Sequence, residues 1–459
     1  MRAPTNRPRT YRQAKTALLT VLVFATAAGG SDWPRFLGPD GDGRSPETGI
    51  RTDWSAGAPP VAWWVEAGEG YAIPTVADGR LFHFDRHGDR ARLTCFDART
   101  GKEHWRSEYP PDYSDYYGYS NGPRSSPVVD GDRVYTFGVE GRLRCHRVTD
   151  GELLWEIDTT AEFGVVQNFF GVGSSPVVEG PLLLTMIGGS PPGSPKIHSG
   201  QVKGNGSAIV AFDKLNGKVR YRFGDELASY STLSVASMHG RRKAFAFTRG
   251  GLLGFDPIAG REEFFVPWRA KVLESVNAAT PVVIDDTVFV SETYGPGSLL
   301  LRVPGSGDPT VVWKDGRRDQ SLQTHWNTPI YHDGYLYASS GRNSGDAELR
   351  AVEHATGKVA WSQPGLKRAT LLYVDGHLVV LGEYGLLQLI EATPERYKVV
   401  SETDLSERTL PGNPKRSILS YPAWGPPVLS HGLLYVRGKD TLVALDLSIP
   451  AATTRDAGP

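Results

Sequence analysis

Aromatic, amide and cationic side chains gather in irregular segments of the sequence. Tyrosines and an arginine occur together in 113–124, aromatic and amide residues in 167–173, and tryptophans in 323–327 and 421–425. Such side chains stack on flat groups and donate hydrogen bonds to anionic or hydroxyl-rich ligands. The candidate ligand-binding residues are Tyr119, Arg124, Gln167, Phe170, Tyr230, His325, Trp326, Arg342 and Trp424.

The sequence lacks the common catalytic and metal-binding signatures. It contains no C-x-x-C, H-E-x-x-H, G-x-S-x-G, G-x-G-x-x-G or P-loop pattern. His83 and His87, and the group Asp40, Asp42 and Glu47, lack the ligand spacing of zinc fingers or EF-hands. We assign no metal ion to either group, and expect solvated turn histidines in the first case and a turn-rich strap in the second.

A unit of about fifty residues recurs along the chain and predicts the elements that position these segments. Most copies open with a small or polar residue, a proline and an apolar run that ends near a glycine. The copies open at Pro74, Pro127, Pro176, Leu233, Pro281, Pro329, Leu372 and Pro427. Alternating apolar residues, with turn signals about every ten residues, indicate short strands rather than helices.

The third strand of a copy begins a fixed step from a small residue to a large aromatic one. The step runs from Cys95 to Trp105, Cys145 to Trp155, Ala211 to Tyr221, Gly254 to Phe264 and Ala351 to Trp361. A glycine occupies one column of the intervening turn, where a tight hairpin needs a positive φ. The aromatic residue is expected to cover the neighbouring sheet. Equivalent points on packed sheets lie about 10 Å apart, too far for a disulfide, so we expect Cys95 and Cys145 to be buried free thiols.

The patterns in 95–105 and 351–361 resemble the tryptophan docking motif of PQQ-like repeats. Such repeats occur in quinoprotein alcohol dehydrogenases and in the outer-membrane-protein assembly lipoprotein. The lead-in 32–43 also resembles that of exported PQQ-like repeat proteins. The resemblance implies an all-β fold, an eight-bladed β-propeller of PQQ-like repeats. Segment 61–65 has no blade of its own and should close the ring beside 441–445, because closure removes an exposed sheet edge.

Four regions are expected along the chain. Residues 1–30 are typical of a signal peptide, with a basic stretch, an apolar run and small residues in order. A turn-rich lead-in strap (31–60), the propeller (61–447) and a flexible C-terminal tail (448–459) follow. The signal peptide predicts a periplasmic or extracellular protein, and no cysteine follows it for lipid attachment. No later apolar stretch is long enough to span a membrane.

The preferred function is that of a binding or scaffold protein. Loops from fourth to first strands and from second to third strands share one face of a propeller, so the candidate residues should converge at the channel mouth. A protein, peptide or glycan would bind there, and we expect a monomer. The formal net charge of −1 becomes more negative once the basic signal peptide is removed, which argues against nucleic acid. The simpler alternatives are that aromatic and proline residues plug the channel and that Arg124 forms a salt bridge between two blades.

The alternative function is a PQQ-dependent alcohol or sugar dehydrogenase. The resemblance then requires adjacent cysteines, a calcium site, an aspartate base and a stacking tryptophan. Trp326 could stack on a flat cofactor, but Cys95 and Cys145 are not adjacent and no base can be assigned. We therefore assign no catalytic residue and no cofactor, and PQQ with calcium belongs to this alternative. A hydrolase or lyase that uses the same face is a third, weaker hypothesis.

Overall fold

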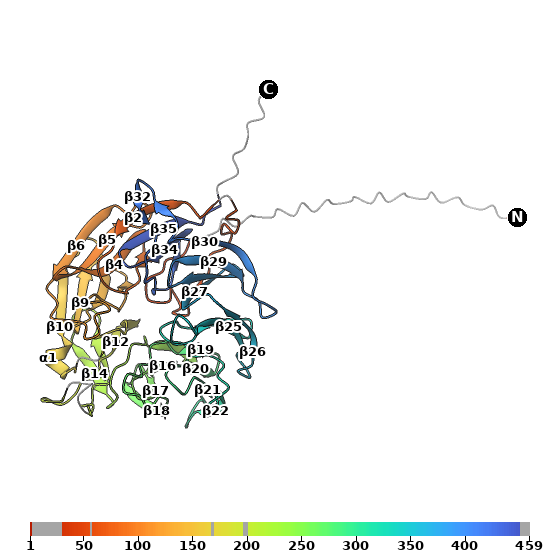
Figure 1. Cartoon of the computed structure of the whole chain (residues 1–459). Coiled ribbons are helices and arrows are strands. Elements are labelled where there is room, and N and C mark those ends of the chain that lie inside the picture. The colour runs from red at the N-terminus through yellow and green to blue at the C-terminus, as the bar shows by residue number, and fades with distance from the viewer. Residues whose placement is uncertain (2–29, 56, 167–168, 196–200, 450–459) are drawn as a thin grey trace.

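The described residues of the computed structural model form one ring of eight sheets around an axis (Figure 1). The structure describes residues 1, 30–55, 57–166, 169–195 and 201–449. Most of the expected signal peptide and of the C-terminal tail, together with Gln167, lie outside these residues. The predicted eight-bladed β-propeller is confirmed, with four strands in each blade and one added strand in blade 7.

Blades 1 to 4 follow one another along the chain. Blade 1 contains β3 (Thr75–Ala77), β4 (Arg80–His87), β5 (Arg90–Asp97) and β6 (Glu103–Tyr109), and blade 2 contains β7 (Val128–Asp130), β8 (Arg133–Phe137), β9 (Arg142–Arg147) and β10 (Leu153–Asp158). The short helix α1 (Thr159–Phe163) follows β10. Blade 3 contains β11 (Val177–Glu179), β12 (Leu182–Met186), β13 (Ile209–Asp213) and β14 (Val219–Phe223), and blade 4 contains β15 (Ser234–Met238), β16 (Arg241–Phe247), β17 (Gly251–Asp256) and β18 (Arg261–Pro267).

Blades 5 to 8 complete the ring. Blade 5 contains β19 (Val282–Ile284), β20 (Thr287–Ser291), β21 (Ser298–Arg302) and β22 (Thr310–Lys314), and blade 6 contains β23 (Ile330–His332), β24 (Tyr335–Ser340), β25 (Glu348–Glu353) and β26 (Val359–Pro364). Blade 7 contains β27 (Ala369–Val374), β28 (His377–Gly382), β29 (Leu386–Glu391) and β30 (Val399–Asp404), followed by the hairpin β31 (Thr409–Leu410) and β32 (Asn413–Ser417). Blade 8 contains β33 (Val428–Ser430), β34 (Leu433–Arg437) and β35 (Thr441–Asp446).

An N-terminal strand closes blade 8, as the sequence predicts. Strand β2 (Val61–Glu66) pairs antiparallel with β35, so that Val61 lies opposite Leu445. The colours of Figure 1 show the same closure, with orange β2 beside blue β35. The lead-in also adds β1 (Arg44–Ser45) to β27 of blade 7 as a parallel strand. Ring closure is therefore made by backbone hydrogen bonds between the two ends of the sequence.

In several blades the aromatic residue of the small-to-aromatic step docks the blade onto the next one. Cys145 lies opposite Trp155 in blade 2, immediately before a β-bulge, and Cys95 lies opposite Trp105 in the same way. The Trp105 Nε1 donates to the Val148 carbonyl of the following blade at 2.9 Å. The indole lies over the turn glycine of that blade, since a Cβ on Gly151 would be 2.4 Å from the ring. Both cysteines are free and buried, in keeping with the column that they share.

The expectation of solvated turn histidines is wrong for His83. Strand β4 is eight residues long, so both histidines belong to the strand and not to its turn. The His83 side chain is 2% exposed and its Nε2 lies 3.4 Å from the buried Asp85 Oδ2, whereas His87 is partly exposed. Glu47 of the lead-in also has a structural role, because its carboxylate accepts hydrogen bonds from the His431 and Gly432 amides of blade 8.

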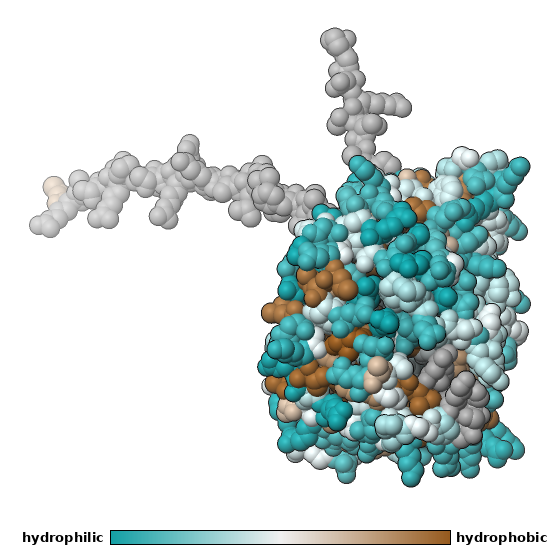
Figure 2. Space-filling model, turned by 90° about the vertical axis from the view of Figure 1, so that its left-hand side faces the viewer, coloured by the Kyte–Doolittle hydropathy of each residue, from teal (hydrophilic) through white to brown (hydrophobic). Residues whose placement is uncertain are grey.

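The side of the molecule seen in Figure 2 is mostly hydrophilic, with hydrophobic patches that hydrophilic atoms separate. In the described part of the chain, no helix has the length and apolar character needed to cross a membrane.

Candidate functional site

A cavity of about 600 Å³ lies where the loops of one face meet. All eight connections from a fourth strand to the next first strand contribute to its lining. They supply Tyr71, Tyr117, Tyr119, Arg124, Phe169, Phe170, Gly173, Ser175, Tyr230, Thr232, Glu274, Val276, Ala278, His325, Trp326, Arg368, Tyr421, Trp424, Gly425 and Pro426. Loops from second to third strands add Tyr294, Arg342 and Asn343. We name this space the axial cavity.

The axial cavity brings together the candidate residues that the structure describes. Its lining includes Tyr119, Arg124, Phe170, Tyr230, His325, Trp326, Arg342 and Trp424. The ninth candidate, Gln167, lies outside the described residues. The structure thus places these eight side chains around one space, and their role in binding a ligand stays a prediction.

One wall of the axial cavity is a row of aromatic rings. The ring centroids of Trp326 and Trp424 are 5.0 Å apart, and Tyr119 follows at 6.3 Å from Trp424. Phe170 lies 6.0 Å from Tyr119 and 5.5 Å from Tyr230. Tyr230 is held in place because its Oη accepts a hydrogen bond from the Phe170 amide at 2.9 Å. The rings are tilted against one another, an arrangement that leaves ring faces for a ligand.

Arg368, a half-buried lining residue, forms an ion pair with the buried Glu383 beside the two tryptophans. The guanidinium donates to the Glu383 carboxylate at 2.6 Å and its carbon lies 4.5 Å from the Trp326 ring centroid. The Trp424 Nε1 donates to the same carboxylate at 3.1 Å. Burial raises the pKa of Glu383, but these hydrogen bonds outweigh burial and hold the pKa below its ordinary value. Arg368 is therefore neutralised by a carboxylate and fixes the orientation of both indoles.

Arg124 is held by its own loop. Its NH2 donates to Asp115 Oδ2 at 2.7 Å, and that buried carboxylate also accepts from the Tyr117 and Ser120 amides. The alternative role, a salt bridge that ties two blades, is wrong in this respect, since both partners lie in the β6–β7 connection. The guanidinium carbon still lies 5.9 Å from the ring centroid of Phe170, which belongs to the next loop.

Two ring nitrogens at the axial cavity have no hydrogen-bond partner among the described residues, and the exposed Arg342 lines the same cavity. The His325 Nε2 lies 3.1 Å from the Tyr294 Oη, but its Nδ1 and the Trp326 Nε1 are buried without a partner among the described residues. Burial, with the nearby Arg368 and Arg342, lowers the pKa of His325 to about 3, so the ring is neutral near pH 7. Arg342 is exposed and forms no ion pair among the described residues, and its guanidinium carbon lies 4.4 Å from the Tyr294 ring centroid. A buried unpaired polar atom can be satisfied by ordered water or by a ligand.

Sequence reasoning missed several lining residues, above all Arg368 and Tyr294. The seventh repeat lacks its opening proline, so the copy is placed at Leu372, whereas β27 begins at Ala369. Arg368 stands immediately before that strand, the position that Arg124 approaches in the second repeat. An alignment of the repeats by their glycines would have placed it at the cavity.

These features define the class of protein: a PQQ-like β-propeller with a ligand-sized cavity at its loop face. Residues 53–189 and 89–363 match the family model described as outer membrane protein assembly factor BamB, and the chain belongs to this PQQ-like repeat family. The crystal structure of BamB from Moraxella catarrhalis is similar with a TM-score of 0.57 at 11% identity, over 84% of this chain and 97% of that one. Quinohemoprotein alcohol dehydrogenase from Comamonas testosteroni is similar with a TM-score of 0.60 at 11% identity, over 92% of this chain and 81% of that one. No curated protein matches the chain. These identities are so low that the likeness establishes the fold alone.

Proposed function

We propose that the chain is an exported binding protein whose axial cavity holds the end of an acidic glycan. The observation that carries this proposal is the combination, in one cavity, of an aromatic wall, the cationic Arg342 and two buried ring nitrogens that have no partner among the described residues. Its volume of about 600 Å³ falls in the usual range for small-molecule sites. A folded partner protein would need a much larger surface.

Each part of the cavity suits a charged sugar. The apolar faces of sugar rings pack on aromatic rings such as Trp424 and Tyr119, because both surfaces are flat and weakly hydrated. Trp326 Nε1 can donate to a hydroxyl group, and His325 Nδ1 can exchange a hydrogen bond with one. The guanidinium of Arg342 can hold a carboxylate through two parallel hydrogen bonds. A neutral sugar would leave that charge unused.

The residues of the cavity do not fit the PQQ–calcium alternative. Its aromatic rings and arginines suit a flat anion, but the described lining residues contain a single carboxylate, Glu274. The loop carboxylates Asp115 and Asp346 are bonded locally, the second to the Asn343 amide at 2.7 Å. No described group of three His, Cys, Asp or Glu side chains could hold a metal ion. We derive no dehydrogenase step for these residues.

Calorimetric titration of the mature protein with a trigalacturonate and with its neutral galactose counterpart tests the proposal. We expect saturable binding of the acidic sugar, and a Kd about tenfold or more weaker in Arg342→Gln because a charged hydrogen-bonded pair is lost. Arg302→Gln is the matched control, since Arg302 ends β21 at the opposite face. Trp424→Ala should weaken both sugars. Equal binding of the two sugars, or an Arg342→Gln variant that binds like wild type, would contradict the proposal.

The family description, an assembly factor, favours a protein partner as the other occupant of the loop face. Crosslinking of the native protein distinguishes the two. If a polypeptide crosslinks to the native protein near Tyr119 and Trp424, and the protein binds no acidic sugar, then the ligand of the axial cavity is a peptide or protein and not a glycan. Identification of small molecules that co-purify with the native chain would decide the matter directly.

A further inference from the structure

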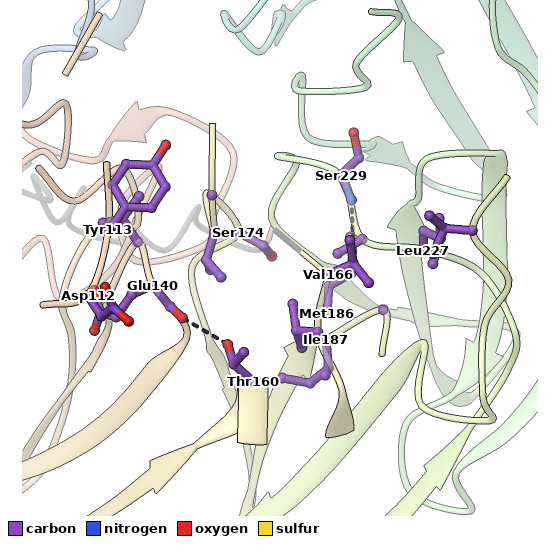
Figure 3. A pocket seen from close by; sticks show the side chains of 17 residues that line it. Asp112, Tyr113, Glu140, Thr160, Val166, Ser174, Met186, Ile187, Leu227 and Ser229 are labelled. Carbon is purple, nitrogen blue, oxygen red and sulfur yellow. Dashed lines mark hydrogen bonds between the residues drawn. The ribbon is translucent and has the colours of Figure 1, made fainter. Parts of the chain in front are cut away.

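A second cavity, of about 220 Å³, is lined by residues from blades 2 and 3 and their adjoining loops (Figure 3). Its lining comes from the β6–β7 loop, the β8–β9 turn, α1, the end of β12 with the β12–β13 loop, and the β10–β11 and β14–β15 loops. We name it the lateral cavity. Figure 3 shows Tyr113 and Glu140 on one side of it and Met186, Leu227 and Ser229 on the other.

The lateral cavity is separate from the axial cavity. The β10–β11 connection runs between them, and its residues divide according to the side that they face. Phe169 and Phe170 line the axial cavity, whereas Val172 and Ser174 line the lateral one. A ligand in one cavity therefore meets different side chains from a ligand in the other.

The lateral cavity is buried and apolar at its inner end and exposed to solvent at its opening. Its floor contains Met186 and Ile187, each 2% exposed, while Asp112 and Thr160 at the mouth are exposed to solvent. Thr160 is fixed there because its Oγ1 donates to the Glu140 carbonyl at 2.9 Å. An apolar group can leave water at the floor, and a polar group can stay hydrated near the mouth.

Two buried polar atoms in this cavity are without partners among the described residues. Ser174, itself 2% exposed, has an unpaired Oγ. Glu140 accepts a hydrogen bond from the Tyr109 Oη at 2.8 Å on Oε1, and its Oε2 is buried and unpaired. Burial raises the pKa of Glu140, which favours the neutral carboxyl group, a donor as well as an acceptor.

We propose that the lateral cavity binds a small uncharged molecule with an apolar ring or branched body and one or two hydroxyl groups. The hydroxyl groups would bond Ser174 Oγ and Glu140 Oε2, and the body would pack on Val172, Met186 and Ile187. None of the described lining residues is lysine, arginine or histidine, so an anion would be desolvated without a counter-charge. An apolar cavity of about 150 Å³ holds benzene, so 220 Å³ has room for a substituted ring of that size.

Cyclopentanol, cyclopentylamine and cyclopentanecarboxylate are matched probes for this site. Titrations followed by saturation-transfer NMR on the mature full chain give Kd values for each. We expect cyclopentanol to bind saturably and more tightly than either charged analogue. Ser174→Ala should weaken cyclopentanol about five- to tenfold, because one hydrogen bond to a buried group is lost.

Val172→Phe fills the lateral cavity and should abolish cyclopentanol binding while trigalacturonate binding at the axial cavity is unchanged. Trp424→Ala is the opposite control and should leave cyclopentanol binding unchanged. Tighter binding of a charged analogue, binding that survives in Val172→Phe or disappears in Trp424→Ala, or no saturable binding at all would overturn the inference. Ser174→Ala deletes a single oxygen, so the test stands even where the larger side chain disturbs folding.

Discussion

The Ala98 carbonyl of blade 1 accepts two buried hydrogen bonds from blade 8, so the contribution of ring closure to the free energy of unfolding can be measured by removing the two donors. Trp63 Nε1 of the closing strand and the Tyr435 Oη of β34 both donate to it at 2.9 Å. The two rings are also in contact, with centroids 5.8 Å apart. Trp63→Phe and Tyr435→Phe each remove one donor, and the double variant removes both.

The loss of unfolding free energy in each variant depends on which hydrogen-bond donors to the Ala98 carbonyl remain. Tyr435→Phe leaves the Trp63 hydrogen bond in place, so we expect a loss of about 1 kcal/mol in the free energy of unfolding. Trp63→Phe also removes ring atoms that pack over Gly101, and should cost about 2–3 kcal/mol. In the double variant the buried carbonyl has no donor, which adds a coupling energy of about 1–2 kcal/mol beyond the sum.

Equilibrium unfolding in urea, followed by far-UV circular dichroism, measures the four proteins of this cycle. Trp361→Phe with Tyr435→Phe is the control cycle, since the Trp361 Nε1 donates to the Thr393 carbonyl, at a different junction. The control pair should be additive within about 0.5 kcal/mol. A coupling between Trp63 and Tyr435 no larger than that of the control would refute the shared carbonyl as the centre of closure.

Three further predictions concern stability and activity. Gly101→Ala should lower the free energy of unfolding, measured by urea titration, by about 3 kcal/mol, and Gly376→Ala should lower it by only about 1 kcal/mol. Both glycines have a positive φ, but an added Cβ would meet another side chain, the Trp63 ring at 2.7 Å, only at Gly101. Equal losses in the two variants would contradict the docking geometry. Burial lowers the pKa of His146 and of His325 to about 3, so the unfolded state binds more protons than the folded state, and the free energy of unfolding should fall as the pH decreases from about 6.5 to 3. His146→Gln should make this dependence on pH less steep. An unchanged slope in that variant would contradict the prediction. Reconstitution with PQQ and Ca²⁺ should give no substrate-dependent dye reduction with alcohols or sugars, and reduction lost on mutating Glu274 would promote the dehydrogenase alternative.

The blades could be predicted from the sequence because each repeat carries local signals for its own turns and its own junction. A glycine such as Gly151 and an aromatic residue such as Trp105 specify one hairpin and one neighbour, whatever the rest of the chain does. The closing segment 61–65 was predictable for a related reason, since the last repeat supplies only three strands. The axial candidates followed from topology: long loops between a fourth and a first strand meet on one face.

The finer features of the cavities could not be predicted, because they depend on side-chain packing between distant residues. Neither the pairing of Arg368 with Glu383 nor the lack of a partner for His325 Nδ1 among the described residues has a sequence signature. The lateral cavity depends on Glu140, whose carboxyl group is positioned by Tyr109 of an outer strand. Residues of this kind are ordinary in sequence and are distinguished only by burial and by the partners that they lack.

Ring closure and the axial cavity depend on the same short segment. Strand β2 leads directly into residues 67–74, where Tyr71 lies 5.0 Å from Trp424 and donates to the Tyr119 carbonyl at 3.2 Å. This segment is anchored on blade 8 by Arg437, which donates to the Gly68 carbonyl at 2.7 Å. Loosening of β2 would therefore shift the aromatic wall as well as open the sheet edge. Trp63→Phe should therefore weaken trigalacturonate binding as well as lower the free energy of unfolding, and a Trp63→Phe variant that is destabilised but binds trigalacturonate like wild type would contradict this link.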